Sequence, residues 1–182
     1  MLNQTVLFII IGVAGLALIA GAVFGARVLW KRQVKRSLIA LTGRREALTA
    51  AWRGLQAVFI ALGATTAEEM ADFASNPEQE QRKSLEDLHG SMVILADDVK
   101  QMALPKTLWR AADLLGAAAE ALARETGRVG EATSPEGVLD ALGEVDVVGV
   151  RAAMLPADVE IDRMLQDLEI ADPSVYGGGL YI

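Results

Sequence analysis

The single histidine of the chain stands at a spacing that metal sites use. Glu86 and His89 are three residues apart, so on a helix their side chains would lie on one face. Di-iron helical bundles combine two such pairs with two further glutamates. Because the 182 residues contain only one histidine, a single copy cannot form that site, and a dimer would be needed to supply the second pair. We therefore expect an ordinary surface or hydrogen-bonded histidine and no metal or other cofactor.

Other catalytic chemistry lacks the residues that it needs. The chain has no cysteine, which excludes thiol catalysis, thiolate metal sites and disulfides. Pairs of carboxylates such as Asp97 and Asp98 normally belong to the solvated face of a helix, and the three glycines at 177–179 precede no helix that could hold a phosphate. The sequence therefore predicts that the protein is not an enzyme and binds no small-molecule substrate.

The C-terminal end carries a different kind of candidate. Leu180, Tyr181 and Ile182 form an apolar triplet that follows three glycines and ends in a free carboxylate. Extended peptides of this kind add to the edge of a sheet, as ligands of PDZ-type domains do. These three residues are a candidate tail ligand, and the alternative is an end without a binding role.

A long apolar stretch lies near the start of the chain. Residues 6–26 contain no charged side chain, and about 20 apolar residues in a helix cross the roughly 30 Å hydrocarbon core of a membrane. An aromatic residue and four basic residues follow, as expected at a membrane surface. We predict a transmembrane helix over residues 6–30, after a short extracytoplasmic segment of residues 1–5. The predicted membrane-surface contacts are Trp30, Lys31, Arg32, Lys35 and Arg36.

The distribution of basic residues predicts the topology. No basic side chain precedes the apolar stretch and several follow it, so the positive-inside rule places the N-terminus outside and the C-terminal domain in the cytoplasm, at the cell membrane. A cleaved signal peptide is the alternative, but it would need a basic start and a shorter apolar core. Residues 46–67 include a second apolar segment. It is too short for a second span, so we predict a buried helix there, with a two-span hairpin as the alternative.

Small residues form a stripe within the predicted span. Ala17, Gly21 and Gly25 recur every four residues, and this spacing lets the backbones of two membrane helices approach closely. The stripe predicts either self-association or docking onto another membrane helix.

Apolar residues beyond the predicted span follow the pattern of packed helices. From Val34 they recur at alternating steps of four and three residues, and only Arg45 interrupts them. Apolar neighbours such as Ile39 and Ile60 widen the stripe beyond what a two-stranded coiled coil needs, which favours a bundle. The predicted helix-seam contacts are Leu38, Leu41, Leu48, Trp52, Leu55, Phe59 and Leu62.

Further helices are predicted by the same spacing and by capping residues. Thr66 and Glu69 match a capping box, and Asn76 and Ser134 each precede a proline, as helix N-caps often do. Residues 144–150 contain a run of valines that is ambiguous between a strand and a helix. Two more segments have the heptad spacing, one through Leu85, Leu88, Met92, Leu95, Val99 and Met102, and one through Leu108, Ala112, Leu115, Ala119, Leu122 and Val129.

These elements predict an all-α fold: one N-terminal transmembrane helix that continues into an antiparallel helical bundle with coiled-coil-like seams. After the extracytoplasmic segment (residues 1–5) and the transmembrane helix (residues 6–30), we expect three further domains. They are a basic juxtamembrane neck with the first heptad helix over residues 31–64, an acidic helical bundle over residues 65–171, and a flexible tail over residues 172–182.

The charge pattern narrows the choice of partners. The net charge is −7, yet residues 1–53 hold eight basic residues and one acidic residue. The rest of the chain is therefore strongly acidic. It would repel phosphate, so we expect no nucleic acid as a partner. The expected partners are membrane lipid and either a second copy of the chain or another membrane protein. We therefore predict a single-pass, membrane-anchored helical scaffold for protein–protein interaction, with an accessory subunit of a larger membrane enzyme or transporter complex as the alternative.

Overall fold

The computed structural model describes the backbone of residues 4–170 and the side chains of residues 21–170. Throughout that part of the chain the regular structure is helical and contains no strand, which confirms the all-α prediction. The elements are α1 (Gln4–Gly63), α2 (Ala67–Ser75), α3 (Glu80–Gln101), the 3₁₀ turn η1 (Lys106–Leu108), α4 (Trp109–Glu131), α5 (Pro135–Gly143) and α6 (Val147–Asp167).

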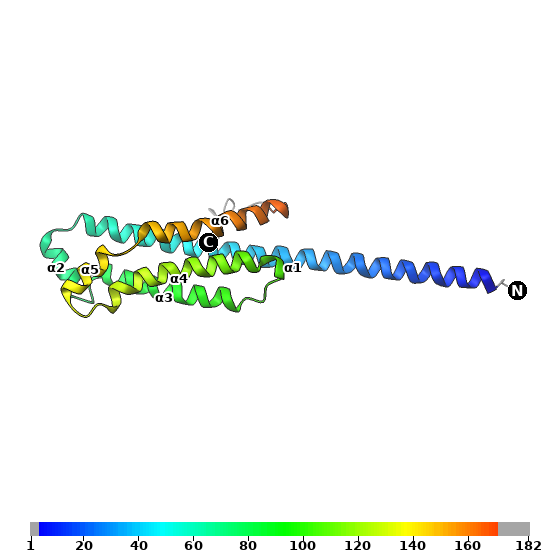
Figure 1. Cartoon of the computed structure of the whole chain (residues 1–182), viewed down its shortest axis with the longest axis horizontal. Coiled ribbons are helices and arrows are strands. Elements are labelled where there is room, and N and C mark those ends of the chain that lie inside the picture. The colour runs from blue at the N-terminus through cyan, green and yellow to red at the C-terminus, as the bar shows by residue number, and fades with distance from the viewer. Residues whose placement is uncertain (1–3, 171–182) are drawn as a thin grey trace, which may run out of the picture.

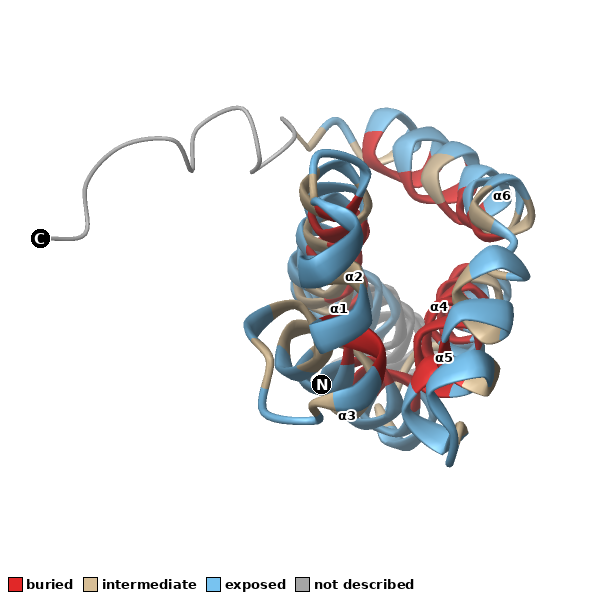
Figure 2. Cartoon of the chain, turned by 90° about the vertical axis from the view of Figure 1, so that its left-hand side faces the viewer, coloured by how far each residue is buried: buried red, intermediate tan, exposed pale blue. Residues whose placement is uncertain are grey.

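Four long helices form the predicted bundle. The second half of α1, α3, α4 and α6 run alternately up and down (Figure 1), with α3 and α6 at opposite corners and each of them packed between α1 and α4 (Figure 2). The short helices α2 and α5 contact each other and close the end of the bundle that lies away from the N-terminus. This up-and-down arrangement with short connections is the usual solution for helices with heptad seams.

The first helix is far longer than the bundle. With 60 residues at 1.5 Å each, α1 extends over about 90 Å, and its N-terminal part projects beyond all the other helices (Figure 1). Val34 is the first buried residue of the described side chains. Among the residues whose side chains are described, no helix is long and apolar enough to cross a membrane. The side chains of residues 6–20 of the predicted span lie outside that set, as do the structure of residues 1–3 and of the predicted tail at 172–182.

The core follows the heptad spacing closely. On α1 the buried face includes Leu38, Leu41, Leu48, Trp52, Leu55 and Leu62. Phe59 is only partly buried, although it packs against the core, and its neighbour Val58 is buried instead. A straight helix turns by about 20° per heptad relative to a strict seven-residue repeat. Toward the end of α1 the buried face therefore includes Val58, while Leu55 and Leu62 keep the heptad register.

The later helices begin at capping residues, with one exception to the prediction. Thr66 and Glu69 form the predicted capping box of α2, and the Ser134 hydroxyl accepts from the Gly137 amide at the start of α5. Asn76, however, ends α2 and does not begin α3. Its side chain accepts from the Glu78 amide in a turn, and Gln79 caps α3 two residues after the proline.

The ambiguous valine run belongs to a helix. Asp146 accepts from the amide of Gly149 and caps α6, so Val147 opens that helix. Val150 then packs into the core while Val148 stays exposed, since successive residues on a helix point in different directions.

Candidate functional site

His89 is held by α4 rather than facing solvent freely. Its Nδ1 lies 2.8 Å from the carbonyl oxygen of Ala123. A carbonyl only accepts, so Nδ1 carries the proton and donates. The approach needs a glycine, because a Cβ at position 127 would lie 2.8 Å from two atoms of the imidazole ring. His89 therefore helps to join α3 to α4, and only its Nε2 is left for other contacts.

A cleft of about 330 Å³ opens beside this histidine. Glu86, one turn before His89, and Arg82 line its α3 side, while Gly130 and Glu131 line its α4 side. Within the residues that the structure describes, no three histidine or carboxylate side chains come together in a way that would hold a metal ion. One imidazole nitrogen beside a solvated carboxylate can accept or donate single hydrogen bonds.

A second group of charges joins α1 to α6. Arg45, the residue that interrupts the seam, has a side chain only 12% exposed and pairs with Asp162. Asp158, one turn earlier, pairs with Arg151 at 3.6 Å. Burial raises the pKa of Asp158 above its ordinary value and the nearby Asp162 raises it further, while Arg151 and Arg45 oppose the rise. Four charged groups thus balance one another along one helix interface, which indicates a packing role.

Glu125 is a buried carboxylate that sequence reasoning missed. It is 6% exposed, accepts a hydrogen bond from the amide of Asp146 at 3.0 Å and lies 3.4 Å from the guanidinium of Arg128. Asp146 is the cap of α6, so Glu125 fixes the point at which the last long helix starts. No sequence pattern marks this contact, because it depends on how α4 and the α5–α6 connection meet.

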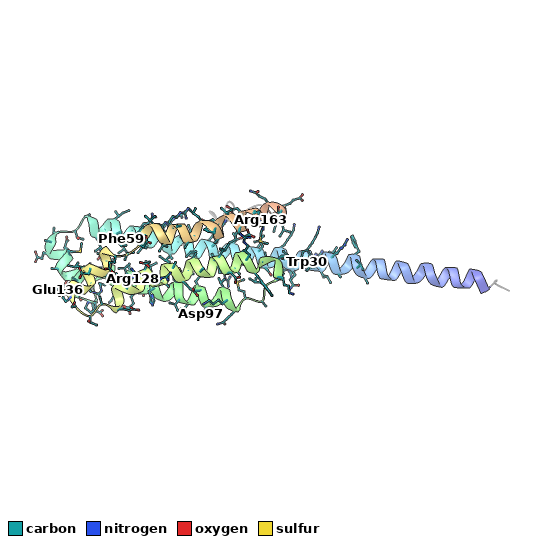
Figure 3. The ribbon with its side chains drawn as sticks, viewed as in Figure 1. Trp30, Phe59, Asp97, Arg128, Glu136 and Arg163 are labelled. Carbon is teal, nitrogen blue, oxygen red and sulfur yellow. The ribbon has the colours of Figure 1, made fainter. Side chains whose placement is uncertain are left out.

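The predicted membrane-surface residues lie at the open end of the bundle. Trp30 is 48% exposed and marks the place where α1 leaves the other helices (Figure 3). The basic side chains of Lys31, Arg32, Lys35 and Arg36 are exposed as well. These four basic residues, called the basic collar below, form no ion pair with any carboxylate of the described residues, so their positive charge is uncompensated.

The other predicted contacts are placed only in part. Gly21 and Gly25 lie on the projecting part of α1, and nothing comes within 4 Å of a Cβ built on either. The side chain of Ala17 and the triplet Leu180, Tyr181 and Ile182 lie outside the described residues.

An exposed apolar stripe on α6 was not predicted. On α6, Val148 is 80% exposed, Leu155 48% and Val159 65%, and exposed Ala152 lies between them. The steps of four, three and four residues place these side chains on one face of the helix. The opposite face of α6, with Met154 and Ile161, is buried in the core. The same spacing in the sequence could have revealed this outer stripe, but it overlaps the buried stripe.

An apolar groove also lies between α1 and α3. It has a volume of about 570 Å³ and is lined mainly by Ala47, Ala50 and Ala51 of α1 and by Leu88 and Ile94 of α3. Ile94 is 70% exposed, and Met92 and Leu95 line the groove as well.

Comparison with known proteins finds no family model that matches the chain, and neither a curated protein nor a solved structure matches it.

Proposed function

We propose that the protein is a non-catalytic, single-pass membrane-anchored scaffold that binds a helix of a partner protein on the outer face of α6. The observation that carries this proposal is the exposed stripe of Val148, Ala152, Leu155 and Val159. Apolar residues on both faces of α6 are typical of a helix that packs against neighbours on two sides. The bundle covers only one of these two faces.

The energetics favour a covered stripe. Burying a valine or leucine side chain contributes about 1.5–3 kcal/mol, so three large side chains supply several kcal/mol toward binding before the costs of association. Charged residues border the stripe: Arg151 and Asp158 on one edge and Arg163 near its end. An apolar stripe with charged borders is the pattern by which helices select a partner helix and its direction.

The membrane part of the proposal is supported by the sequence. Residues 6–26 carry no charge and are followed by the uncompensated basic collar, which is the arrangement of a single-pass anchor with a cytoplasmic domain. In that arrangement α6 would lie alongside α1, away from the membrane, with its outer face open to another membrane protein or a second copy (Figure 1).

Crosslinking in native membranes tests the scaffold role. We expect the full chain to be captured with a partner and Leu155→Asp to lose that product, because a carboxylate would have to be buried at the centre of the stripe. Ile94→Asp is the matched control: it places the same charge at an exposed apolar residue of α3 and should leave the product unchanged. A chain that remains uncaptured, or equal capture of both variants, would overturn the proposal.

The composition of the captured complex separates the two forms of this function. Purification in mild detergent that yields only this chain supports a self-assembling scaffold. Stoichiometric foreign subunits would instead identify an accessory subunit, for which the open Gly21 and Gly25 offer a second contact within the bilayer.

A further inference from the structure

The connection between α3 and α4 lies at the same end of the bundle as the basic collar. Trp30 and Gln33 of α1 share a surface hollow with Leu104, Pro105 and Lys106 of this connection. Two segments that are some 70 residues apart in the sequence thus lie side by side where α1 leaves the bundle (Figures 1 and 3).

The connection presents a tryptophan and a lysine to solvent in a fixed arrangement. Trp109 is 53% exposed, yet its indole NH donates to the carbonyl of Leu104 at 3.0 Å. The ammonium group of Lys106 lies 5.8 Å from the centre of the indole ring, within the range of a cation–π contact. Tryptophan with neighbouring basic residues is the composition found at the interface of a membrane with water.

The connection and the neighbouring stretch of α1 carry basic side chains and no acidic ones. Neither residues 21–45 nor residues 99–112 contain a carboxylate side chain, and Lys106 and Arg110 form no ion pair with the carboxylates that the structure describes. Acidic residues border this basic surface: exposed Asp113 lies one turn beyond Trp109 in α4 and lines a hollow with it, and Asp167 and Glu169 lie at the end of α6. The α3–α4 side is therefore complementary to an anionic surface.

The height of the connection matches that surface. From Ala26, where the uncharged stretch ends, to Gln33 the helix α1 rises by about 10 Å. The polar layer on each side of a bilayer is roughly 5–7 Å thick. Since α1 has no break between these residues, the connection beside Gln33 is held close to the lipid headgroups and cannot swing away on a linker.

We infer that the α3–α4 connection is a second membrane-contact site, in which Lys106, Trp109 and Arg110 bind the headgroups of anionic lipid. This inference rests on the proposed membrane anchor. It gives the bundle two points of contact with the membrane, the collar of α1 and this connection, so that the bundle is fixed in orientation as well as in height.

Spin labels on single introduced cysteines test the inference, because the chain has no cysteine of its own. We propose labels at Thr107→Cys in the connection, Val23→Cys in the predicted span and Glu136→Cys at the far end of the bundle (Figure 3). All three positions are exposed. The full chain would be reconstituted in equimolar phosphatidylcholine and phosphatidylglycerol, and collisions with oxygen and with a water-soluble nickel complex would be measured at each label.

We expect the labels at 23 and 107 to collide with oxygen more than with nickel, and the label at 136 to show the reverse. The signal at 107 should fall in phosphatidylcholine alone, and also when Lys106→Gln and Arg110→Gln are added. A label at 107 in water while that at 23 is in lipid, or equal lipid contact at 107 in both lipid mixtures, would overturn the inference but leave the anchor standing. A label at 23 in water would overturn the anchor, and the inference with it.

Discussion

The only histidine of the chain, His89, fills a gap between α3 and α4. Its ring occupies the room that a glycine leaves on α4, and its Nδ1–H bonds to the backbone carbonyl of Ala123. The Glu-x-x-His spacing did predict that Glu86 and His89 share one side of α3, and both line the same cleft. It did not predict the contact with Gly127, because the register between α3 and α4 is set by the whole interface and not by local sequence.

Replacing Gly127 with alanine should destabilise the bundle. The added Cβ would lie 2.8 Å from the imidazole, so His89 would have to move and lose its bond to Ala123. We expect a cost of about 1–3 kcal/mol from overpacking, which outweighs the gain in helix propensity of about 1 kcal/mol. Urea unfolding of the full chain in mild detergent, followed by circular dichroism, measures the change.

Gly90→Ala provides the matched control for this substitution. Gly90 also lies within a helix, but nothing comes within 4 Å of its Cβ position, so the variant should gain up to about 1 kcal/mol in stability. If both variants became more stable by the same amount, the contact between His89 and α4 would not constrain the bundle.

At the scale of the helix, apolar spacing predicted the buried faces well where one stripe faces one core. Leu115 and Leu122 of α4, like Leu48 and Leu55 of α1, are fully or almost fully buried. The spacing failed where a helix has two apolar stripes. On α6 the residues of the outer stripe and those of the core alternate along the chain, so periodicity alone could not assign them to separate faces.

Charge within the seam was harder to interpret from sequence. Arg45 stood out as an interruption, but its partner Asp162 lies 117 residues later, and only the antiparallel packing of α1 on α6 brings the two together. Asp158, one turn before Asp162, is half-buried at the same interface.

Asp158 should make the stability of the α1–α6 interface depend on pH. Burial raises its pKa in the folded state, so the folded protein binds the proton more tightly than the unfolded chain and stability falls as pH rises above the ordinary value of 3.8. Asp158→Asn removes this half-buried charge. The variant should therefore be more stable than the native chain at neutral pH, with a difference that shrinks as the pH is lowered to about 3, below the ordinary pKa of an aspartate, where the carboxyl holds its proton in both states.

Urea midpoints at both pH values measure this difference. Asp113→Asn, which changes an exposed carboxylate on α4, is the control variant. A variant of Asp158 that is less stable at neutral pH would show that the attraction of Arg151 and Arg45 outweighs the cost of burial.

For the whole molecule, the described core lies entirely within the bundle. No residue from 21 to 33 is buried, and Val34 is the first to join the core. A chain that starts at Lys31 should therefore keep the helical bundle and unfold cooperatively in buffer without detergent. Circular dichroism and a thermal melt measure this, with sedimentation to report whether the α6 stripe then draws two copies together.

A shortened chain that melts without a cooperative transition would show that the projecting half of α1 contributes to folding. The comparison has a built-in control, since a start at residue 41 removes Val34 and Leu38 from the core and should cost several kcal/mol.

Because α1 is unbroken between Gly25 and Val34, the length of this stretch sets both how far the bundle lies along the helix axis and how it is turned about that axis. Each residue added to an α-helix turns everything beyond it by about 100° and advances it by 1.5 Å. Two residues inserted in this stretch would therefore turn α6 through more than half a circle about the α1 axis, while seven would return it almost to its starting azimuth about 10 Å farther out. In an anchored chain, the direction around the α1 axis in which α6 faces its neighbours is therefore set by the number of residues between Gly25 and Val34, although this segment contacts none of those neighbours.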